Sequence, residues 1–347
     1  MAVLAGGLSS EHEVSRWSGE RVLESLDRHR YRPISVLIEA GGSWVVGGLR
    51  KAGPLEGVAA LCDLRCDVAF LALHGPFGED GTIQGFLETA GLPYTGSGVA
   101  GSALCADKIR TKRLVAAAGF EVAADLTLPP HGLRDVPARL GFPVFVKNPY
   151  GGSTLEVRLA RTPSELAAAV DELRPAGDVL LVERAASGRE LTVPILDDEE
   201  GHPRALPVVE VRSDGDFFDF RNKYTAGVAQ EIVPAPIPAE VARRLQEETL
   251  RIHRLLGLRA MSRSDFILSS DGSATYLETN SIPGLTPTSL LPLAAKSVGI
   301  PFSGVLTRLV EGAAAGRMGR PWSVSSARRG GRSTGSSTAA TAARSSS

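Results

Sequence analysis

The chain has 347 residues, of which 43% are hydrophobic and 22% charged, and its formal net charge is −1. This length accommodates two or three globular domains, and the balanced charge provides no strong field that would attract nucleic acid or an anionic membrane. No run of the sequence approaches about 18 consecutive apolar residues, so no transmembrane helix is predicted.

The N-terminal part of the chain predicts an α/β unit. Residues 1–7 are apolar and end in Gly-Gly, which favours a buried strand over a signal peptide because no basic segment precedes them. Apolar residues over 14–26, including Trp17, recur at helical spacing, and residues 31–39 predict a second strand. The continuous apolar run at 66–73 is typical of a strand buried on both faces, so we expect a mostly parallel sheet.

Two further units and a tail follow. The predicted elements are a helix over 108–118, strands over 142–147, 179–183, 207–212 and 263–280, and a helix over 239–256. From Met318 the chain is rich in Ser, Arg, Gly and Ala and cannot bury enough apolar surface to offset its ordering entropy. We therefore expect domains at 1–108, 109–195 and 196–317, and a disordered tail at 318–347.

The cysteines indicate a reducing compartment. Cys62, Cys66 and Cys105 are an odd and sparse set that forms no disulfide framework. No second Cys/His pair lies near Cys62 and Cys66 at the spacing of a zinc site. We therefore expect a cytoplasmic protein.

The stretch YLETNSIPGLT at 276–286 suggests a metal site. Successive side chains of a strand point to opposite faces, so Glu278 and Asn280 share one face. If this strand pairs with the predicted strand at 263–268, Asp265 can join them, and all three side chains offer the hard oxygen ligands that magnesium takes. Taken alone, however, the stretch fits a polar strand end and a surface turn better.

Two glycine-rich stretches are suited to anions. In ALHGPFGEDGTIQG (72–85), His74 follows the buried strand, at the edge where open α/β sheets bind ligands. In VKNPYGGSTLEV (146–157), Lys147 precedes a turn with Ser153 that can hold phosphate through backbone N–H groups, hydroxyls and one cation. A capped loop explains the first stretch equally well, and a simple β-turn explains the second better.

Three more polar patterns occur downstream. Glu183 and Glu190 flank a turn in VERAASGREL, and a carboxylate can accept both hydroxyls of a ribose. The stretch FFDFRNKYTAG can form a lid with Lys223 and Tyr224, and Ser289 lies near the start of an apolar helix, whose free N–H groups attract a carboxylate. Solvated glutamates and an exposed loop are the plainer explanations. In combination, the patterns describe a nucleoside triphosphate held by magnesium beside a carboxylate substrate.

Seven motifs, in this order, make the chain resemble the D-alanine–D-alanine ligases of the ATP-grasp superfamily. They are GGLSSEHEVS, ALHGPFGEDGTIQG, GLPYTGSGV, ADKIRTK, VERAASGRELTV, FFDFRNKY and LETNSIPGLTPTSLLP. The resemblance covers residues 1–315 and implies a three-domain ATP-grasp fold, α/β with an α+β ATP-grasp part, whose N-terminal domain has a parallel sheet. It also implies ATP-dependent joining of two D-alanines through a D-alanyl phosphate, for peptidoglycan precursors, by a homodimer.

The resemblance implies a role for each matching residue. The implied nucleotide contacts are Lys108 and Lys147 at the phosphates, Glu183 on the adenine side, Glu190 at the ribose and Lys223 near the γ-phosphate. The implied ligands of two magnesium ions, which manganese can replace, are Asp265, Glu278 and Asn280. The implied catalytic residues are Glu11, Ser153 and Tyr224 around the first D-alanine, and Arg263 and Gly284 at the tetrahedral intermediate. The implied substrate contacts are His74, beside the first D-alanine, and Ser289 and Leu290, at the carboxylate of the second.

The chain departs from the family pattern in the loop after Lys147. Asn148 replaces the usual proline, and Glu156 stands where the family has a glycine. A carboxylate at that position would repel ATP or push the loop outward, and it also removes the conformational freedom of glycine. Phe218 and Phe220 replace commoner tyrosines of the lid.

These departures leave two alternatives open. One is a paralogous ligase with another acceptor, such as D-lactate or an amino acid of specialised metabolism, and the other is a catalytically impaired homologue. The pair of Lys223 and Tyr224 favours a dipeptide product, because depsipeptide-forming relatives usually lack that tyrosine. A dinucleotide-binding oxidoreductase is disfavoured, since no GxGxxG follows the first strand.

Overall fold

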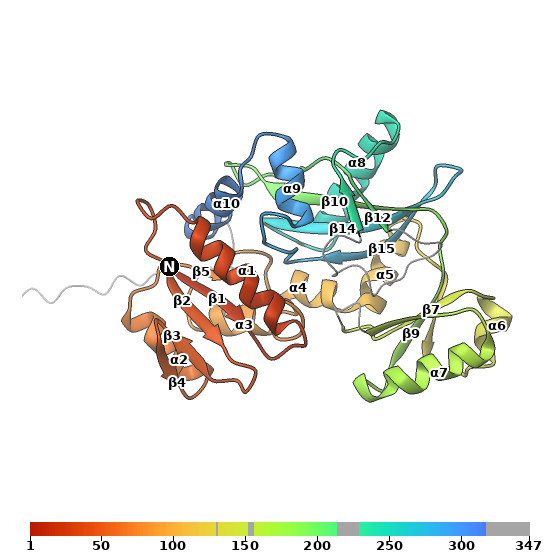
Figure 1. The fold of residues 1–347 in the computed structure, drawn as a ribbon, viewed down its shortest axis with the longest axis horizontal. Coiled ribbons are helices and arrows are strands. Elements are labelled where there is room, and N and C mark those ends of the chain that lie inside the picture. The colour runs from red at the N-terminus through yellow and green to blue at the C-terminus, as the bar shows by residue number, and fades with distance from the viewer. Residues whose placement is uncertain (130, 152–155, 214–228, 317–347) are drawn as a thin grey trace, which may run out of the picture.

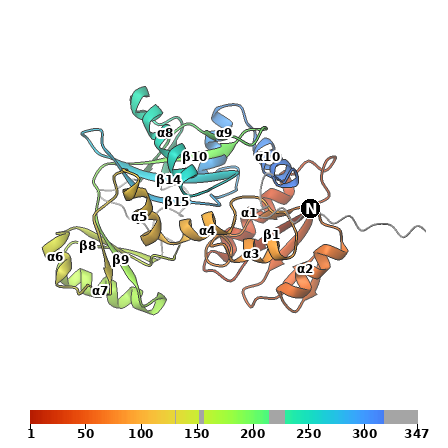
Figure 2. The same ribbon diagram turned by 180° about the vertical axis from the view of Figure 1, so that it is seen from behind.

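The computed structural model describes residues 1–129, 131–151, 156–213 and 229–316. Three β-sheets succeed one another along the chain, and helices α4 (Val99–Ala106) and α5 (Lys108–Ala117) lie between them in both views (Figures 1 and 2). The predicted tail, the predicted lid and Ser153 lie outside the described residues.

The N-terminal sheet is mixed, with the strand order β4-β3-β2-β1-β5. Its elements are β1 (Ala2–Gly6), α1 (His12–Ser25), β2 (Ile34–Ile38), β3 (Trp44–Val46), β4 (Leu49–Lys51), α2 (Pro54–Asp63), β5 (Ala69–Leu71) and α3 (Thr82–Thr89). Strand β1 is parallel to both β2 and β5, as the apolar pattern predicts. The other edge, formed by β3 and β4, is antiparallel. The connections there are too short for the crossover that parallel strands need.

Helix α1 packs on β1 through small side chains. Its buried residues are Ser15, Ser18, Gly19 and Val22. A Cβ at Gly19 would overlap that of Ala5, and Ser15 Oγ accepts a hydrogen bond of 2.8 Å from the N–H of Gly6. The helix therefore approaches the strand too closely for a large residue. The prediction that Trp17 belongs to the buried face is wrong, because its side chain points outward and is 59% exposed.

The middle sheet is antiparallel, with the strand order β6-β9-β7-β8, and it forms a lobe of its own in Figure 1. Its elements are β6 (Asp125–Leu128), α6 (Asp135–Arg139), β7 (Val144–Lys147), β8 (Val157–Ala160), α7 (Pro163–Leu173), the 3-10 helix η2 (Arg174–Ala176) and β9 (Leu180–Arg184). Leu166 and Val170 of α7 are buried in the same core as Val144 and Val146 of β7. Strand β7 ends at Lys147, so this side chain lies where the strand leaves the sheet.

The third sheet is antiparallel, with the strand order β13-β12-β10-β14-β15 and with β11 paired to β10. Its elements are β10 (Arg189–Asp197), β11 (Pro203–Ala205), β12 (Val209–Ser213), β13 (Ala229–Ile232), α8 (Ala239–Leu255), β14 (Met261–Leu268) and β15 (Ala274–Asn280). The hairpin predicted from the sequence is confirmed, and Asp265 lies directly opposite Glu278.

Helices α9 (Leu290–Ser297) and α10 (Phe302–Ala314) return to the N-terminal sheet. Leu291 and Leu309 belong to the same apolar core as β1 and β5, and the hydroxyl of Tyr31 donates a hydrogen bond of 2.6 Å to Glu311. Helices α9 and α10 thus complete the hydrophobic core of the N-terminal sheet. Among the described residues, no single helix is long and apolar enough to cross a membrane. The pair of α9 and α10, bent by 106°, passes that test of length and composition when the two are taken together.

Candidate active site

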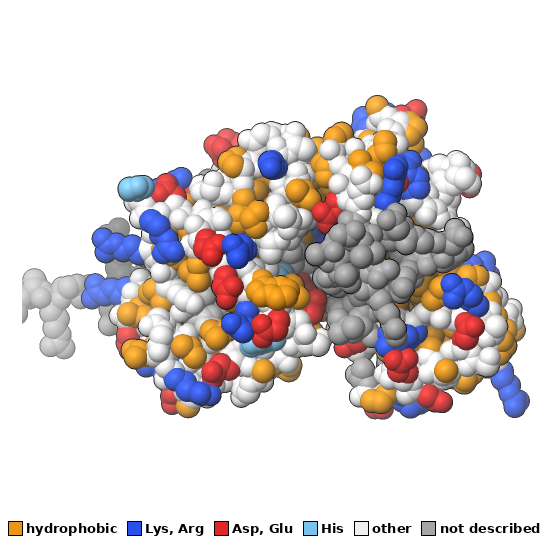
Figure 3. All heavy atoms as spheres, in the orientation of Figure 1, with side chains coloured by type: hydrophobic (Ala, Val, Ile, Leu, Met, Phe, Trp, Pro, Cys, Tyr) orange, Lys and Arg blue, Asp and Glu red, His pale blue; other side chains and the backbone are white. Residues whose placement is uncertain are grey.

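A cavity lies where the three sheets meet. Its walls come from α1, the loop after β5, the start of α5, the end of β7, β10, the β14–β15 hairpin and the segment that leads into α9. The predicted site residues that line it are Glu11, His74, Lys108, Lys147, Glu190, Arg263, Asp265, Glu278, Asn280, Gly284, Ser289 and Leu290. On the outer face viewed in Figure 3, acidic and basic side chains of the described residues are interspersed.

The β14–β15 hairpin holds its carboxylates in pairs with basic groups. Asp265 accepts hydrogen bonds from Arg263 Nε at 2.9 Å and Nη2 at 2.7 Å, and from Thr192 Oγ1 at 2.5 Å. Glu278 lies across from it and pairs with Lys108 Nζ at 2.7 Å. Side chains of directly opposite residues lie on the same face of a sheet, so both carboxylates face the cavity.

The hairpin residues fit a magnesium ion. The Asn280 carboxamide lines the cavity on the same face of the hairpin as the two carboxylates and can offer its oxygen to a metal ion, while its Nδ2 is buried without a hydrogen-bond partner among the described residues. The described part of the chain contains no cluster of three or more His, Cys, Asp or Glu side chains that would hold a metal without other ligands. Two carboxylates and one carboxamide leave room for phosphate oxygens and water, as is usual for magnesium.

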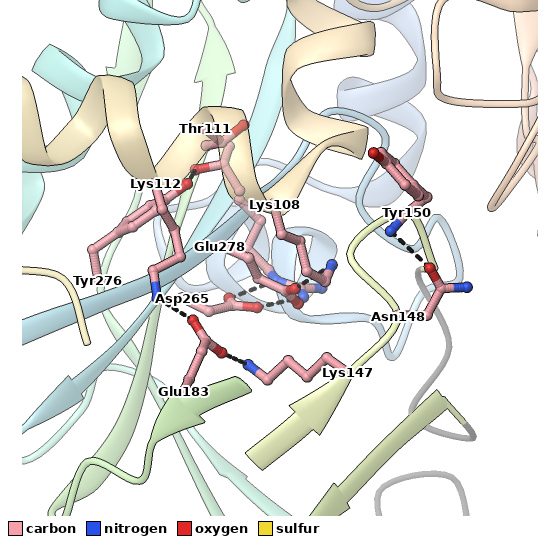
Figure 4. Close-up of polar contacts among 12 residues, drawn as sticks. Lys108, Thr111, Lys112, Lys147, Asn148, Tyr150, Glu183, Asp265, Tyr276 and Glu278 are labelled. Carbon is pink, nitrogen blue, oxygen red and sulfur yellow. Dashed lines mark hydrogen bonds and ion pairs between the residues drawn. The ribbon is translucent and has the colours of Figure 1, made fainter. Parts of the chain in front are cut away.

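Two lysines bring positive charge to the cavity from different elements (Figure 4). Lys108 begins α5, and burial would lower its pKa, but the Glu278 carboxylate outweighs burial and the pKa is raised. Lys147 ends β7 and pairs with Glu183, which also pairs with Lys112. Burial would raise the pKa of Glu183, but Lys147 and Lys112 lower it to about 2. Each lysine therefore faces a glutamate carboxylate at close range.

The N-terminal domain contributes two carboxyl groups and a histidine. Burial is the main reason why the pKa of Glu11, at the start of α1, is raised. Burial also lowers the pKa of His74 to about 4, so its imidazole is neutral at pH 7. Glu79 Oε1 accepts a hydrogen bond of 2.9 Å from the N–H of Gly75, whereas Oε2 is buried without a partner among the described residues. Burial, and then the charge of Glu11, raise the pKa of Glu79 to about 8.

The remaining wall leads into α9. Ser289 occupies the N-cap position of this helix, and Leu290 is its first residue. Ser289 Oγ accepts a hydrogen bond of 3.1 Å from the N–H of Thr286. A Cβ at Gly284 would lie only 2.9 Å from Ser289 Oγ, so the backbone can approach this hydroxyl because the residue is glycine. The hydroxyl and the free N–H groups of the helix start are suited to a carboxylate.

The two departures from the family pattern contact each other. Asn148 Nδ2 donates a hydrogen bond of 2.8 Å to Glu156 Oε2. Asn148 Oδ1 accepts one of 3.0 Å from the N–H of Tyr150 (Figure 4). A Cβ at Gly151 would overlap the Glu156 carboxylate, so the glycine gives that carboxylate its space. Asn148 and Glu156 thus form a matched pair in the cavity wall.

Glu183 differs from the other predicted site residues that the structure describes. It does not line the cavity but lies behind its wall, 3% exposed, with its carboxylate between Lys112 and Lys147 (Figure 4). The predicted site residues Ser153, Lys223 and Tyr224, and the lid residues Phe218 and Phe220, lie outside the described residues.

The sequence analysis overlooked Glu79 and Lys112. Glu79 stands in the ALHGPFGEDGTIQG motif, whose glycines were the predicted feature, and its Oε2 atom is buried. Lys112 follows Lys108 by four residues in α5, so the two side chains lie on the same face of the helix. That spacing was the signal that could have identified it.

Two family models match the chain. The model described as D-ala D-ala ligase N-terminus matches residues 1–57 and 56–97, and the model described as D-ala D-ala ligase C-terminus matches residues 116–311. The chain belongs to the D-alanine–D-alanine ligase family. Among its curated relatives is the D-alanine–D-alanine ligase of Oleidesulfovibrio alaskensis, which is 42% identical and covers 89% of this chain and 94% of its own length. That of Leptospira biflexa is 39% identical and covers 90% and 97%.

Solved structures of this ligase family have the same fold. The D-alanine–D-alanine ligase of Coxiella burnetii has a TM-score of 0.77 at 27% identity and covers 91% of this chain and 93% of its own. The VanG D-Ala:D-Ser ligase of Enterococcus faecalis has a TM-score of 0.76 at 30% identity, with 89% and 98% covered. The Bacillus anthracis ligase complexed with ATP has a TM-score of 0.74 at 29% identity, with 91% and 97% covered. The predicted ATP-grasp fold is confirmed.

Proposed function

We propose that the protein joins two D-alanines into D-alanyl-D-alanine, coupled to the conversion of ATP to ADP and phosphate, and that the dipeptide supplies peptidoglycan synthesis. The observation that carries the proposal is the cavity, in which Lys108, Lys147 and Arg263 surround the paired carboxylates of Asp265 and Glu278. The curated relatives bear the name of this ligase, and one family structure holds ATP.

The first half of the reaction activates a carboxylate. A carboxylate is a poor acyl donor because oxide is a poor leaving group, whereas an acyl phosphate releases phosphate readily. Lys108 and Lys147 would hold the nucleotide phosphates, and Glu190 the ribose, so that phosphoryl transfer depends on positioning and charge. Two magnesium ions, held by Asp265, Glu278 and Asn280, would supply charge neutralisation at the phosphates when bound.

The second half forms the peptide bond. Glu11 would bind the ammonium of the first D-alanine beside the neutral His74, together with Ser153 and Tyr224. The neutral amine of the second D-alanine attacks the acyl carbon and the C–N bond forms. The C–O bond to phosphate then breaks, phosphate leaves with the bonding electron pair, and the nitrogen gives up a proton to phosphate or water. Arg263 and the backbone at Gly284 would stabilise the oxyanion.

The remaining contacts belong to the substrate's distal groups and to the lid. Ser289 and the Leu290 backbone would hold the carboxylate of the second D-alanine, and Lys223 would reach the γ-phosphate. We also propose the division into domains at 1–108, 109–195 and 196–317. The three sheets support it except at the second boundary, because β10 (Arg189–Asp197) of the third sheet begins before residue 196. The proposed homodimer is supported by the family resemblance alone.

Phosphate release by the purified protein with MgATP, measured with and without D-alanine, tests the proposal. We expect release that depends on D-alanine and a product with the mass of D-alanyl-D-alanine. Competition with D-serine and D-lactate identifies any other acceptor by the product mass, and light scattering on the same sample tests the dimer. Phosphate release that no D-amino acid or D-hydroxy acid stimulates would overturn the proposed ligation.

A further inference from the structure

Lys112 is a buried cation between two facing carboxylates. Its side chain is 1% exposed, and Nζ donates a hydrogen bond of 2.9 Å to the carbonyl of Ala123, pairs with Glu183 and lies 3.5 Å from Asp125 Oδ1. Asp125 and Glu183 lie directly opposite each other on β6 and β9. Like charges in that position repel each other, and an ammonium group between the two carboxylates offsets this repulsion.

Five side chains of alternating charge run from the surface to the cavity. Arg113, which is 59% exposed, pairs with Asp125 at 2.8 Å, and Asp125 lies 3.5 Å from Lys112. Glu183 and Lys147 follow, and Figure 4 shows these last three side chains in that order. Of these five, Lys147 is the one that lines the cavity. Lys147 can bind a nucleotide phosphate only by sharing or leaving its pairing with Glu183. A buried carboxylate that loses its counter-ion is strongly destabilised.

We propose that Lys112 is a positioning residue of the nucleotide site, which neutralises Glu183 permanently and so leaves Lys147 free to turn to the nucleotide phosphates. The inference rests on the proposed contact between Lys147 and the nucleotide. It assigns to Glu183 an indirect part in nucleotide binding, from behind the cavity wall, in place of a contact on the adenine side.

Calorimetric titration with ADP and magnesium at pH 7.5 tests this role. In Lys112→Met, we expect ADP to bind at least tenfold more weakly and the KM for ATP to rise similarly, with the KM for D-alanine within threefold of wild type. Lys112→Arg, which keeps the charge, should bind ADP within about threefold of wild type. Arg113→Gln, which changes the exposed end of the chain of charges, is the matched control and should leave binding unchanged.

Proton linkage separates positioning from a structural role. The charged groups that face Glu183 are Lys112 from α5, Lys147 from β7 and Asp125 from β6, and Lys108 acts on it from farther along α5. When Lys147 turns to ADP in Lys112→Met, Glu183 loses both of its paired cations, with Asp125 opposite it and Lys108 farther away, and it should take up a proton. Titrations in buffers of different ionisation enthalpy should therefore show proton uptake in Lys112→Met beyond that of wild type.

A double-mutant cycle keeps the inference testable if Lys112→Met does not fold. On a Glu183→Gln background, no buried charge is left to neutralise at that position, so adding Lys112→Met should change the affinity for ADP less than threefold. A further tenfold loss there, or wild-type affinity in Lys112→Met, would overturn the inference. Lys147→Met is the separate control for the proposed function. If Lys147→Met binds ADP as wild type does, the proposed contact between Lys147 and the phosphates is wrong. If Lys147→Met loses affinity for ADP while Lys112→Met binds ADP normally, only the proposed role of Lys112 is wrong.

Discussion

Glu156 changes the chemistry of the cavity wall at a single position. The residue type predicts repulsion of ATP, but its carboxylate accepts a hydrogen bond from Asn148, which is itself a departure from the family pattern. Gly151 leaves the space that this carboxylate fills. The two substitutions therefore compensate each other, and neither is understood without its partner.

Removing one member of this pair should harm the protein more than removing both. Asn148→Ala leaves the Glu156 carboxylate without its donor beside the nucleotide site, so we expect the KM for ATP to rise several-fold. In Asn148→Ala/Glu156→Gly, the KM for ATP should return toward that of wild type. Contacting side chains of this kind couple by about 0.5–3 kcal/mol, which steady-state kinetics of the four proteins resolves. Additive effects would show that the two residues act independently.

The hairpin carboxylates give a second prediction at the scale of single residues. Asp265→Asn and Glu278→Gln keep the size of each side chain but remove the charge that is proposed to hold magnesium, so ATP turnover should fall at least a hundredfold. Circular dichroism should show an intact fold. Near-normal turnover in either variant would contradict the metal assignment, and Glu248→Gln on α8, outside the cavity lining, is the control for loss of a carboxylate.

Glu79 should make the stability of the protein depend on pH. Burial raises its pKa from 4.5 to about 8 in the folded protein, so folding takes up a proton between these values. The stabilisation that accompanies this proton is fully present below pH 4.5 and is lost as the pH rises through about 8. Glu79→Gln does not titrate, so its free energy of unfolding, from urea titrations, should exceed that of wild type more at pH 8.5 than at pH 5. An equal difference at both pH values would show that Glu79 is ionised throughout.

The position of helix α1 is fixed by its close contact with strand β1. It carries Glu11 at its start and contributes Ser18 to the cavity wall, so its distance from β1 decides where these groups lie. Gly19 allows that distance, because a Cβ there would overlap the side chain of Ala5, which is attached directly to the strand backbone and cannot move aside.

Gly19→Ala should therefore destabilise the protein. Alanine gains about 1 kcal/mol of helix propensity over glycine, but overpacking of a well-filled contact costs about 1–3 kcal/mol. We expect a net loss in the free energy of unfolding and a weaker affinity for D-alanine, measured by urea titration and by KM. Trp17→Gln on the exposed face of the same helix should change stability by less than about 0.5 kcal/mol. A more stable Gly19→Ala variant would contradict the close packing.

The sequence predicts some of these elements better than others, for physical reasons. The β14–β15 hairpin follows from alternation, because a strand fixes which side chains share a face, and Asp265 and Glu278 do lie opposite each other. The buried face of α1 does not follow from apolar spacing, because the approach of β1 selects small residues and leaves Trp17 outside. The position of Glu183 behind the cavity wall depends on Lys112, whose burial comes from packing between distant elements.

The first and the last described elements of the chain share one hydrophobic core. Helices α9 and α10 complete the core of the N-terminal sheet, and the described chain ends two residues after α10, at Gly316. Residues 318–347, predicted from composition to be disordered, follow this completed core. Their removal should change neither the melting temperature nor the rate of dipeptide formation, as thermal unfolding and phosphate release can measure. A large loss of either would show that the tail contributes to the fold or to the site.

The ion pairs of Arg263 with Asp265 and of Lys108 with Glu278 bear on the order in which metal and nucleotide bind. At the proposed metal site, divalent ions on their own would have to displace a guanidinium or an ammonium group, so we expect the protein without nucleotide to bind them weakly. Nucleotide phosphates at the proposed site would draw Lys108 toward themselves and release the Glu278 carboxylate. We therefore expect the metal and the nucleotide to bind together as one complex, and divalent cations alone to bind the site weakly between turnovers.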